Sequence, residues 1–307
     1  MNRLSRNLTV AALALAIPIS AAAAPPAESN QFLIEFNGPV PANFENAVRK
    51  AGGVVSHDMS EIGYVTAISD DPAFARKLAR NRGIQSVERD MRVQWIPEKH
   101  EFMSAANPVQ DMGLGIDPNG AVLGACQWAN HQVMASAAWA KGETGQGVKV
   151  AVIDSGVDPD HIDLMGQIDM DYSVSMISEG NEECDYYSEL FYGEKDSESI
   201  RDFRFHGTFV AGAIAAHGLL TAGVAPDSQI VGIKGLDCTG TGNFGDLIAA
   251  VVYAAQVPGV EVINMSLGAY FPKTSGPRTS AGRFLAAVTR AINYANSRGV
   301  LGVSAAG

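Results

Sequence analysis

The sequence predicts an α/β protein, in which a doubly wound, mostly parallel sheet is preceded by a small α+β domain of ferredoxin-like order. Two patterns support this prediction. After residue 127, apolar strands alternate with helical segments, which is typical of a parallel sheet covered by helices on both faces. Residues 31–94 instead follow the order β-α-β-β-α-β. With 307 residues, 47% of them hydrophobic, the chain is long enough to bury both cores.

The predicted small domain divides into five segments. The apolar run at 32–36 indicates a strand, and 42–52 indicates a helix that ends at a glycine. Residues 53–69 predict two strands around a turn, 71–81 a second helix, and 83–94 the last strand.

In the predicted large domain, each strand is a nearly continuous apolar run that leads into a longer helical segment. Buried parallel strands joined by right-handed crossovers have this pattern. We expect strands at 148–156, 228–236, 260–267 and 300–303, and helices at 206–218, 245–256 and 280–299.

We divide the chain into four parts: a signal peptide, the small domain, a linker and the large domain. Residues 1–24 have basic, apolar and small-residue zones in the order of a signal peptide, which predicts a secreted or periplasmic protein. Their apolar zone is too short to favour a membrane span, and no later segment is long enough, so we expect no membrane anchor. We assign 25–106 to the small domain, 107–126 to a linker and 127–307 to the large domain; the irregular composition begins near residue 95.

The charge of the chain limits its partners. The net charge is −11, so we expect no nucleic-acid partner. The acidic residues are concentrated between Glu179 and Asp202. This segment is either a solvated surface insertion or a cation site, since clustered carboxylates can bind Ca²⁺.

Two residues are candidates for acid–base chemistry. Asp154 ends the strand 148–156, and His206 begins a helix rich in small residues. Each residue alone is more often structural. Together they supply two parts of a relay in which a histidine takes a proton from a hydroxyl and an aspartate orients it. The order aspartate, histidine and later serine is one of the known chain orders for this relay.

Four motifs around these residues resemble the subtilisin (subtilase, peptidase S8) family of serine proteases. They are VAVIDSGVDPDHIDL, HGTFVAG, GVAPDSQIVGIKGL and VINMSLG. The resemblance implies a secreted serine endopeptidase made as a zymogen, which acts on polypeptide substrates. Asp154 would be its orienting acid and His206 its general base. Residues 31–94 resemble the family's propeptide, which would be a partner of the same chain.

The resemblance also implies a substrate cleft with bare backbone on both sides. A peptide would pair there as an added strand, and glycines would leave room for it. Asn264 would help to shape the site. One wall would be Ser266, Leu267 and Gly268, and the opposite edge Gly240, Thr241 and Gly242.

The three cysteines leave one thiol over in any pairing. The resemblance to proteinase K-like members implies a disulfide between Cys184 and Cys238, which leaves Cys126. No cofactor is required by the resemblance. A structural Ca²⁺ at Asp163 is an open alternative, although the loop after Ala216 is shorter than the calcium loop of some family members.

Two further expectations concern the end of the chain and a rival motif. In the family, the motif at 304–307 continues with an oxyanion asparagine, and Gly-Thr-Ser follows later. Neither occurs within the 307 residues, so we expect the serine and asparagine beyond Gly307 and an inactive 307-residue chain. The alternative is a naturally truncated, non-catalytic product that binds or inhibits proteases. The G-x-G-x-x-G at 240–245 resembles a dinucleotide motif, but Glu261 begins the next strand instead of ending it.

Overall fold

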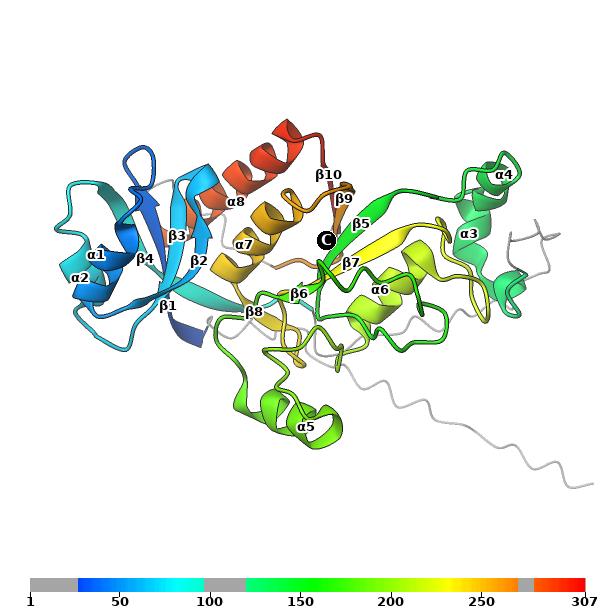
Figure 1. Cartoon of the computed structure of the whole chain (residues 1–307), viewed down its shortest axis with the longest axis horizontal. Helices are drawn as coiled ribbons and strands as arrows, with labels where there is room; N and C mark the ends of the chain where they lie inside the picture. The colour runs from blue at the N-terminus through cyan, green and yellow to red at the C-terminus, as the bar shows by residue number, and fades with distance from the viewer. Residues whose placement is uncertain (1–26, 97–119, 270–278, 307) are drawn as a thin grey trace, which may run out of the picture.

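The computed structural model describes residues 27–96, 120–269 and 279–306. The predicted signal peptide and most of the predicted linker lie outside these residues. The described chain forms two five-stranded sheets, and the helices α7 (Phe244–Ala254) and α8 (Ser280–Ser297) lie between them (Figure 1). In the described residues, no helix is both long and apolar enough to cross a membrane.

The N-terminal sheet is antiparallel, with the strand order β2-β3-β1-β4-β8. Its fifth strand, β8, comes from the second half of the chain. The helices of this region are shorter than the sequence predicts, but the order β-α-β-β-α-β is the predicted one. The elements are β1 (Ala27–Phe36), α1 (Phe44–Ala51), β2 (Val54–Met59), β3 (Tyr64–Ile68), α2 (Phe74–Leu78), β4 (Ile84–Gln94) and β8 (Thr241–Asn243), with a 3₁₀ turn at Ser60–Ile62.

Side chains of the N-terminal sheet alternate between two cores, as the period of a strand requires. Phe32 and Ile34 of β1 pack in a cluster with α1 and α2. Leu33, between them in sequence, packs in the larger cluster that contains α7 and α8. Tyr64 of β3 also belongs to that larger cluster. The N-terminal sheet is therefore buried on both faces.

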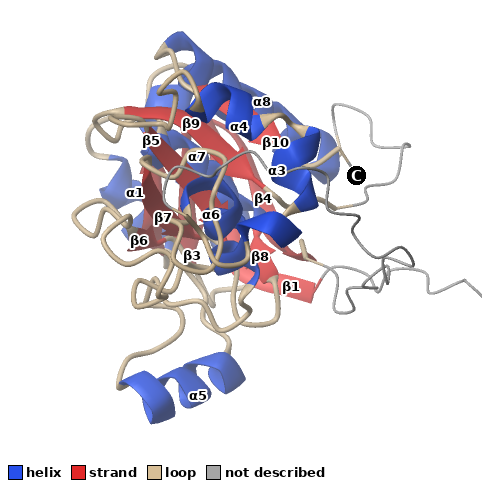
Figure 2. Cartoon of the chain, turned by 90° about the vertical axis from the view of Figure 1, so that its right-hand side faces the viewer, coloured by secondary structure: helices blue, strands red, loops and turns tan. Residues whose placement is uncertain are grey.

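The second sheet is parallel at every pairing and has the strand order β10-β9-β5-β7-β6. This confirms the predicted parallel α/β sheet. The helices α7 and α8 cover one face, and α6 covers the other (Figure 2). The new elements are β5 (Lys149–Asp154), β6 (Val174–Ser175), α6 (His206–Ala215), β7 (Gln229–Lys234), β9 (Val260–Met265) and β10 (Leu301–Ser304).

Three short helices lie outside this layered core. The helix α5 extends away from the body of the molecule in both views (Figures 1 and 2). It is part of the acidic segment that the sequence predicts to be a surface insertion. A 3₁₀ turn at Gly124–Cys126 precedes the helices α3 and α4. The three helices are α3 (Trp128–Gln132), α4 (Ala135–Trp139) and α5 (Glu182–Tyr192).

Candidate active site

The structure brings Asp154 and His206 into direct contact. Asp154 is the last residue of β5 and is completely buried. His206 is the first residue of α6, and its Nδ1 lies 2.8 Å from Oδ1 of Asp154. The preceding Phe205 has a φ of 62°, in the left-handed region that a bulky side chain rarely adopts. This turn places the imidazole over the carboxyl edge of the parallel sheet.

The Asp154 carboxylate sets both the charge and the tautomer of His206. The hydrogen bond that His206 donates to the Asp154 carboxylate raises the pKa of His206 above its usual value, while burial acts in the opposite direction. Because Nδ1–H donates to this carboxylate, Nε2 of the neutral imidazole carries the basic lone pair. The pair can therefore accept a proton at Nε2 and stabilise the resulting imidazolium.

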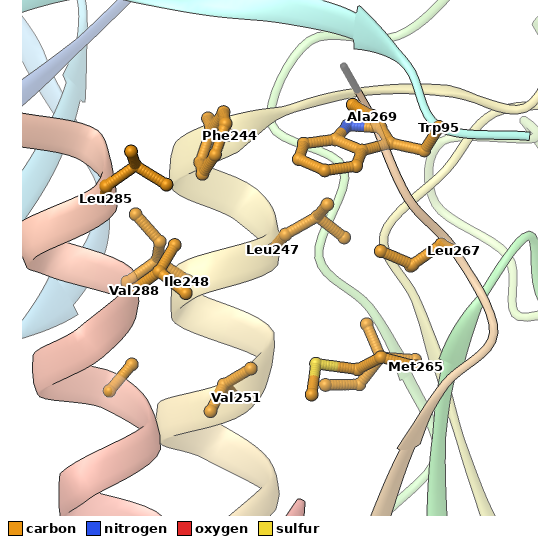
Figure 3. Close-up of a pocket in the computed structure, with 12 residues that line it drawn as sticks. Trp95, Phe244, Leu247, Ile248, Val251, Met265, Leu267, Ala269, Leu285 and Val288 are labelled. Atoms are coloured by element: carbon orange, nitrogen blue, oxygen red, sulfur yellow. The ribbon is translucent and has the colours of Figure 1, made fainter. Parts of the chain in front are cut away.

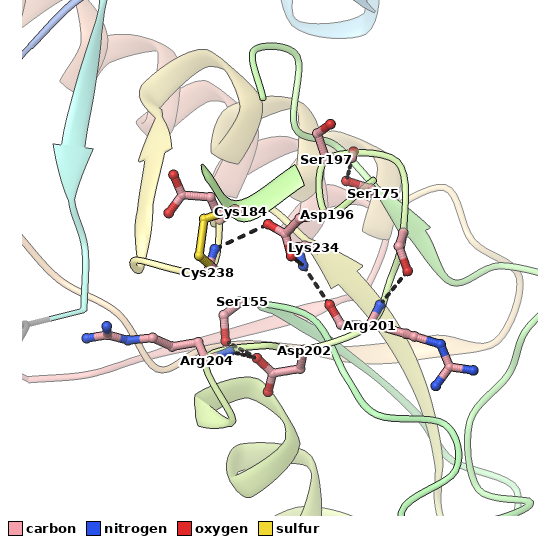
Figure 4. Close-up of polar contacts among 12 residues, drawn as sticks. Ser155, Ser175, Cys184, Asp196, Ser197, Arg201, Asp202, Arg204, Lys234 and Cys238 are labelled. Atoms are coloured by element: carbon pink, nitrogen blue, oxygen red, sulfur yellow. Dashed lines mark hydrogen bonds and ion pairs between the residues drawn. A yellow bond between two sulfur atoms is a disulfide. The ribbon is translucent and has the colours of Figure 1, made fainter. Parts of the chain in front are cut away.

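A second buried carboxylate, Asp202, fixes the start of α6. Its Oδ2 accepts hydrogen bonds from the backbone N–H and the hydroxyl of Thr208, each at 2.8 Å. Its Oδ1 accepts from the Ser155 hydroxyl at 2.9 Å (Figure 4). Sequence reasoning missed Asp202, although an aspartate shortly before a helix is a recognisable capping signal.

The helix can approach the sheet this closely because residue 207 is a glycine. A Cβ atom at Gly207 would lie 2.1 Å from the carbonyl oxygen of Gly156 and 3.0 Å from Cβ of Asp154. Any side chain here would push His206 away from Asp154. The small residues of this motif therefore set the distance within the pair.

The predicted cleft edges lie on either side of one strand of the same chain. The end of β4 pairs antiparallel with β8. Gly240 accepts through its carbonyl from the N–H groups of Trp95 (3.0 Å) and Ile96 (3.2 Å). From the other side, the N–H of Gly268 donates to the carbonyl of Trp95 at 3.3 Å. The paired positions are Arg92 with Asn243, Val93 with Gly242 and Gln94 with Thr241.

Trp95 lines an apolar cavity together with side chains of α7, of α8 and of the end of β9 (Figure 3). Its indole N–H donates to the carbonyl of Gly242 at 3.0 Å, and its ring packs against Phe244. The cavity has a volume of about 290 Å³. Its lining includes Leu247, Met265, Leu267 and Leu285.

The strand β4 ends at Gln94, and Trp95 and Ile96 have no regular secondary structure, as the sequence predicts. Both residues are nevertheless buried, with exposed fractions of only 6% and 1%. Their backbone N–H groups donate to Gly240, and the carbonyl of Trp95 accepts from Gly268. The sequence analysis did not predict this burial.

At two positions of the edge, neighbouring atoms leave no room for a side chain. A Cβ atom on Gly242 would lie 2.3 Å from the carbonyl oxygen of Gly235. Gly240 has a φ of +80°, and a Cβ atom there would lie 2.9 Å from Cβ of Ile96. At Gly242 the constraint comes from a neighbouring loop of the same region, and at Gly240 from Ile96; the need for bare backbone beside a substrate stays a prediction.

The wall residues point to alternate sides of the strand end. Leu267 lines the apolar cavity. Ser266 and Asn264 line a separate surface depression together with Phe209 of α6. The amide of Asn264 donates to the Ser266 hydroxyl at 3.0 Å. Asn264 lies in β9, in register with Val152 of β5.

The structure contains the expected disulfide between Cys184 and Cys238, and Cys126 is a free, exposed cysteine. The disulfide joins α5 to the loop just before Gly240 (Figure 4). Beside it, the buried Lys234 contacts Asp196 at 2.6 Å, and burial raises the pKa of that carboxyl. The acidic insertion is therefore attached to the cleft edge both covalently and by a buried ion pair.

Asp163, the candidate calcium ligand, bonds to protein groups instead. Its carboxylate accepts from the backbone N–H of Leu220 (2.7 Å) and from the N–H and hydroxyl of Thr221 (both 3.0 Å). In the part of the chain that the structure describes, no group of three or more His, Cys, Asp or Glu side chains is arranged to hold a metal ion. Calcium binding stays a prediction.

A dinucleotide would bind at the N-terminus of α7, but this helix end contacts the N-terminal region of the chain. Asp90 of β4 accepts from the N–H of Gly245 at 2.8 Å, at the first turn of α7. Burial, and then the charge of Asp246, raise the pKa of Asp90 to about 8. The G-x-G-x-x-G segment is thus part of the contact between the two halves.

Comparisons with known proteins point to one family. A model of the subtilase family (Peptidase_S8) matches residues 145–307. Subtilisin E of Bacillus subtilis is 28% identical over 268 residues, which cover 87% of this chain and 55% of that protein. The thermophilic serine proteinase of Bacillus sp. strain AK1 is 32% identical over 195 residues, covering 62% of this chain and 40% of that protein.

The fold is also similar to that of a solved structure. The epidermin leader peptide processing serine protease of Staphylococcus aureus matches with a TM-score of 0.66 at 22% identity, over 92% of this chain and 61% of that one. The chain spans about half the length of the curated relatives named above. Because the family model matches more than half of the chain, and matches the part that contains Asp154 and His206, the chain belongs to the subtilase family.

Proposed function

We propose that this protein is a serine endopeptidase of the subtilisin type, exported through residues 1–24 and made with an N-terminal inhibitory domain. One observation carries the proposal: Nδ1 of His206 lies 2.8 Å from Oδ1 of Asp154 at the carboxyl end of β5. The backbone contacts of Trp95 and Ile96 with Gly240 and Gly268 support a peptide-binding edge. Orienting carboxylate, base and peptide-binding edge are the parts that acyl transfer to a serine requires.

In the proposed reaction, Nε2 of His206 takes the proton of a serine hydroxyl as the serine oxygen bonds to the peptide carbonyl carbon. His206 then gives the proton to the leaving amine, and the carbon–nitrogen bond breaks. Asp154 holds the imidazole and stabilises its charged form throughout. Water repeats the sequence on the acyl-enzyme and releases the acid product.

The resemblance to the family assigns the nucleophile to a Gly-Thr-Ser motif and part of the oxyanion site to an asparagine. Residues 1–307 contain no Gly-Thr-Ser. We therefore propose that the 307-residue chain alone hydrolyses no peptide. The acid and the base of the relay do not form an acyl-enzyme without a hydroxyl.

We also propose that the N-terminal region acts as the propeptide. In support, Trp95 and Ile96, which directly follow its last strand β4, make backbone hydrogen bonds with Gly240 and Gly268. We propose that a substrate would make the same bonds. The strand order β2-β3-β1-β4 with two helices on one face supports a ferredoxin-like domain. Such an occupant inhibits until the linker is cut and the strand leaves.

A fluorogenic peptide assay tests the proposed function. It compares the 307-residue chain with the product of the complete reading frame, each with and without a serine-directed phosphonate. We expect phosphonate-sensitive turnover by the complete product and its loss on His206→Ala, with His131→Ala in α3 as the matched control. Inhibition of other subtilisins by both proteins, without turnover by either, would favour the non-catalytic alternative.

A further inference from the structure

Arg92 of β4 reaches out of the N-terminal region into the second half of the chain. Its Nη2 lies 2.5 Å from Oδ2 of Asp237, and its Nη1 donates to the carbonyl oxygen of Glu179 at 3.0 Å. The Asp237 side chain is 2% exposed. The guanidinium thus makes two directed contacts, one with a buried carboxylate and one with a backbone carbonyl.

The orientation of Asp237 does not depend on Arg92. Oδ1 of Asp237 accepts from the N–H (2.9 Å) and hydroxyl (2.6 Å) of Thr239 and from the N–H of Thr241 (3.1 Å). These donors belong to the cleft edge itself. Oδ2 accepts from Asn181 at 3.2 Å and otherwise from Arg92. The cleft edge therefore holds one oxygen of Asp237 toward the cation.

The acidic insertion provides the other half of this arrangement. Glu179 and Asn181 lie just before α5, and the Cys184–Cys238 disulfide ties α5 to the residue after Asp237. Residues 179–202 contain nine acidic side chains against Lys195 and Arg201, which gives a charge of 2 − 9 = −7. Such a segment attracts cationic groups to this end of the cleft.

We propose that Asp237 and the Glu179 carbonyl form a guanidinium-binding subsite for a polypeptide substrate. The subsite takes an arginine that lies three residues before the residue in the place of Trp95, because Arg92 has that spacing in the paired strand. This inference rests on the proposed function. When residues 92–96 leave the cleft, Asp237 keeps its hydrogen bonds but loses its cation, and a buried charge without a counter-charge is costly.

The geometry selects arginine over lysine. The carboxylate and the carbonyl contact two different nitrogens of one planar fork. An ammonium group is a single point charge on a flexible stem and does not reproduce two fixed directions. Substrates with arginine in this register should bind best, followed by lysine and then by neutral side chains.

The first test needs no protease activity. In the 307-residue chain, Arg92→Ala vacates the subsite, and methylguanidinium is titrated while thermal unfolding is followed. We expect a saturable rise in Tm of about 2–4 °C. Arg92→Ala/Asp237→Asn should show no rise, since asparagine keeps the Oδ1 acceptor but lacks the charge. Arg89→Ala, which removes a neighbouring arginine bonded to the Ser29 carbonyl, is the matched control.

An equal rise in Tm for all three variants would overturn the subsite. The Arg92–Asp237 ion pair would then have only a structural role in the folded chain. A rise that is confined to Arg92→Ala supports the subsite. The salt concentration is kept constant throughout, because the interaction is electrostatic.

The second test uses the product of the complete reading frame and peptides that differ only at the arginine position. With arginine, kcat/KM should exceed that of the neutral isostere citrulline by about tenfold or more, and Asp237→Asn should reduce this ratio to about one. Equal cleavage of both peptides by the unmodified enzyme overturns the subsite but supports the proposed function. If neither peptide is cleaved, the proposed function fails, and the titration still decides whether the site binds guanidinium.

Discussion

The two sheets of the molecule bury their faces differently, although both use α7 and α8. The N-terminal sheet has its own helices, α1 and α2, on one face and α7 and α8 on the other. The parallel sheet has α7 and α8 on one face and α6 on the other, but its edge strand β10 leaves Leu301 60% and Val303 44% exposed. The α7–α8 layer is therefore a core that both halves share.

This difference matches the two roles that we propose for the halves, inhibition and chemistry. The N-terminal region contacts the shared helices through Asp90 at α7 and through an ion pair of Glu88 with Arg283 at α8. The second half contributes Asp154 and His206, neither of which belongs to the shared core. Changes at the relay should alter activity alone, and changes in the shared core should affect both halves.

The largest expected effect is on turnover. In the product of the complete reading frame, His206→Ala should lower kcat by about 10⁶-fold. Asp154→Asn should lower kcat by about 10⁴-fold, because the asparagine no longer holds the imidazole in the tautomer with the proton on Nδ1. Circular dichroism of both variants should match that of the unmodified protein. A smaller loss, or a loss that follows unfolding, would contradict the assignment of the relay.

The shared core gives the next effect. Phe284 of α8 is completely buried in the cluster that joins both halves. Phe284→Ala should lower the free energy of unfolding by about 3–5 kcal/mol. Phe74→Ala, equally buried among α1 and α2, should cost a similar amount. Hydrogen exchange separates the two: Phe284→Ala should weaken protection in both sheets, but Phe74→Ala mainly in the N-terminal sheet. Identical exchange patterns would show that the core is not divided in this way.

Removal of the disulfide should have a smaller effect. Cys184→Ser/Cys238→Ser opens a loop between residues 54 positions apart, which should lower the free energy of unfolding by about 2–4 kcal/mol. Cys126→Ser changes an exposed, free thiol and serves as the control. Denaturant midpoints of both variants decide the matter. An unchanged midpoint in the double variant would mean that the insertion adds nothing to the stability of the second half.

The sequence allowed the parallel sheet and the contact between Asp154 and His206 to be predicted, because each depends on local motifs. The role of residues 240–242 as a substrate edge stays a prediction. Apolar runs reveal buried strands, and the resemblance to a family assigns roles to motif positions. The Cys184–Cys238 pairing also followed from that resemblance. These features need no knowledge of how the two halves meet.

The contacts between the halves could not be predicted. That β8 joins the N-terminal sheet, that Trp95 enters the cavity and that Arg92 reaches Asp237 all depend on the register of β4. A strand with unpaired edge groups accepts any partner of suitable spacing, so its sequence does not specify that partner. Asp202 was missed for a related reason, since its role depends on the packing of α6 against β5.

The smallest expected effect is a shift in one titration, and it tests whether Asp154 acts on His206 when no substrate is present. The hydrogen bond raises the pKa of His206 in the folded chain. The protonated pair therefore contributes stability that is fully present below the unfolded pKa near 6.5 and is lost as the pH rises through the folded value. NMR of the imidazole resonances in the 307-residue chain should give a midpoint above 6.5 for the signal that disappears in His206→Ala. Asp154→Asn should lower that midpoint, because the neutral amide stabilises the imidazolium less. The same pKa sets the acid limb of kcat/KM in the complete product, since only neutral His206 accepts the serine proton. A midpoint that does not change in Asp154→Asn would separate the geometry of the pair from its electrostatics and would leave Asp154 with an orienting role only.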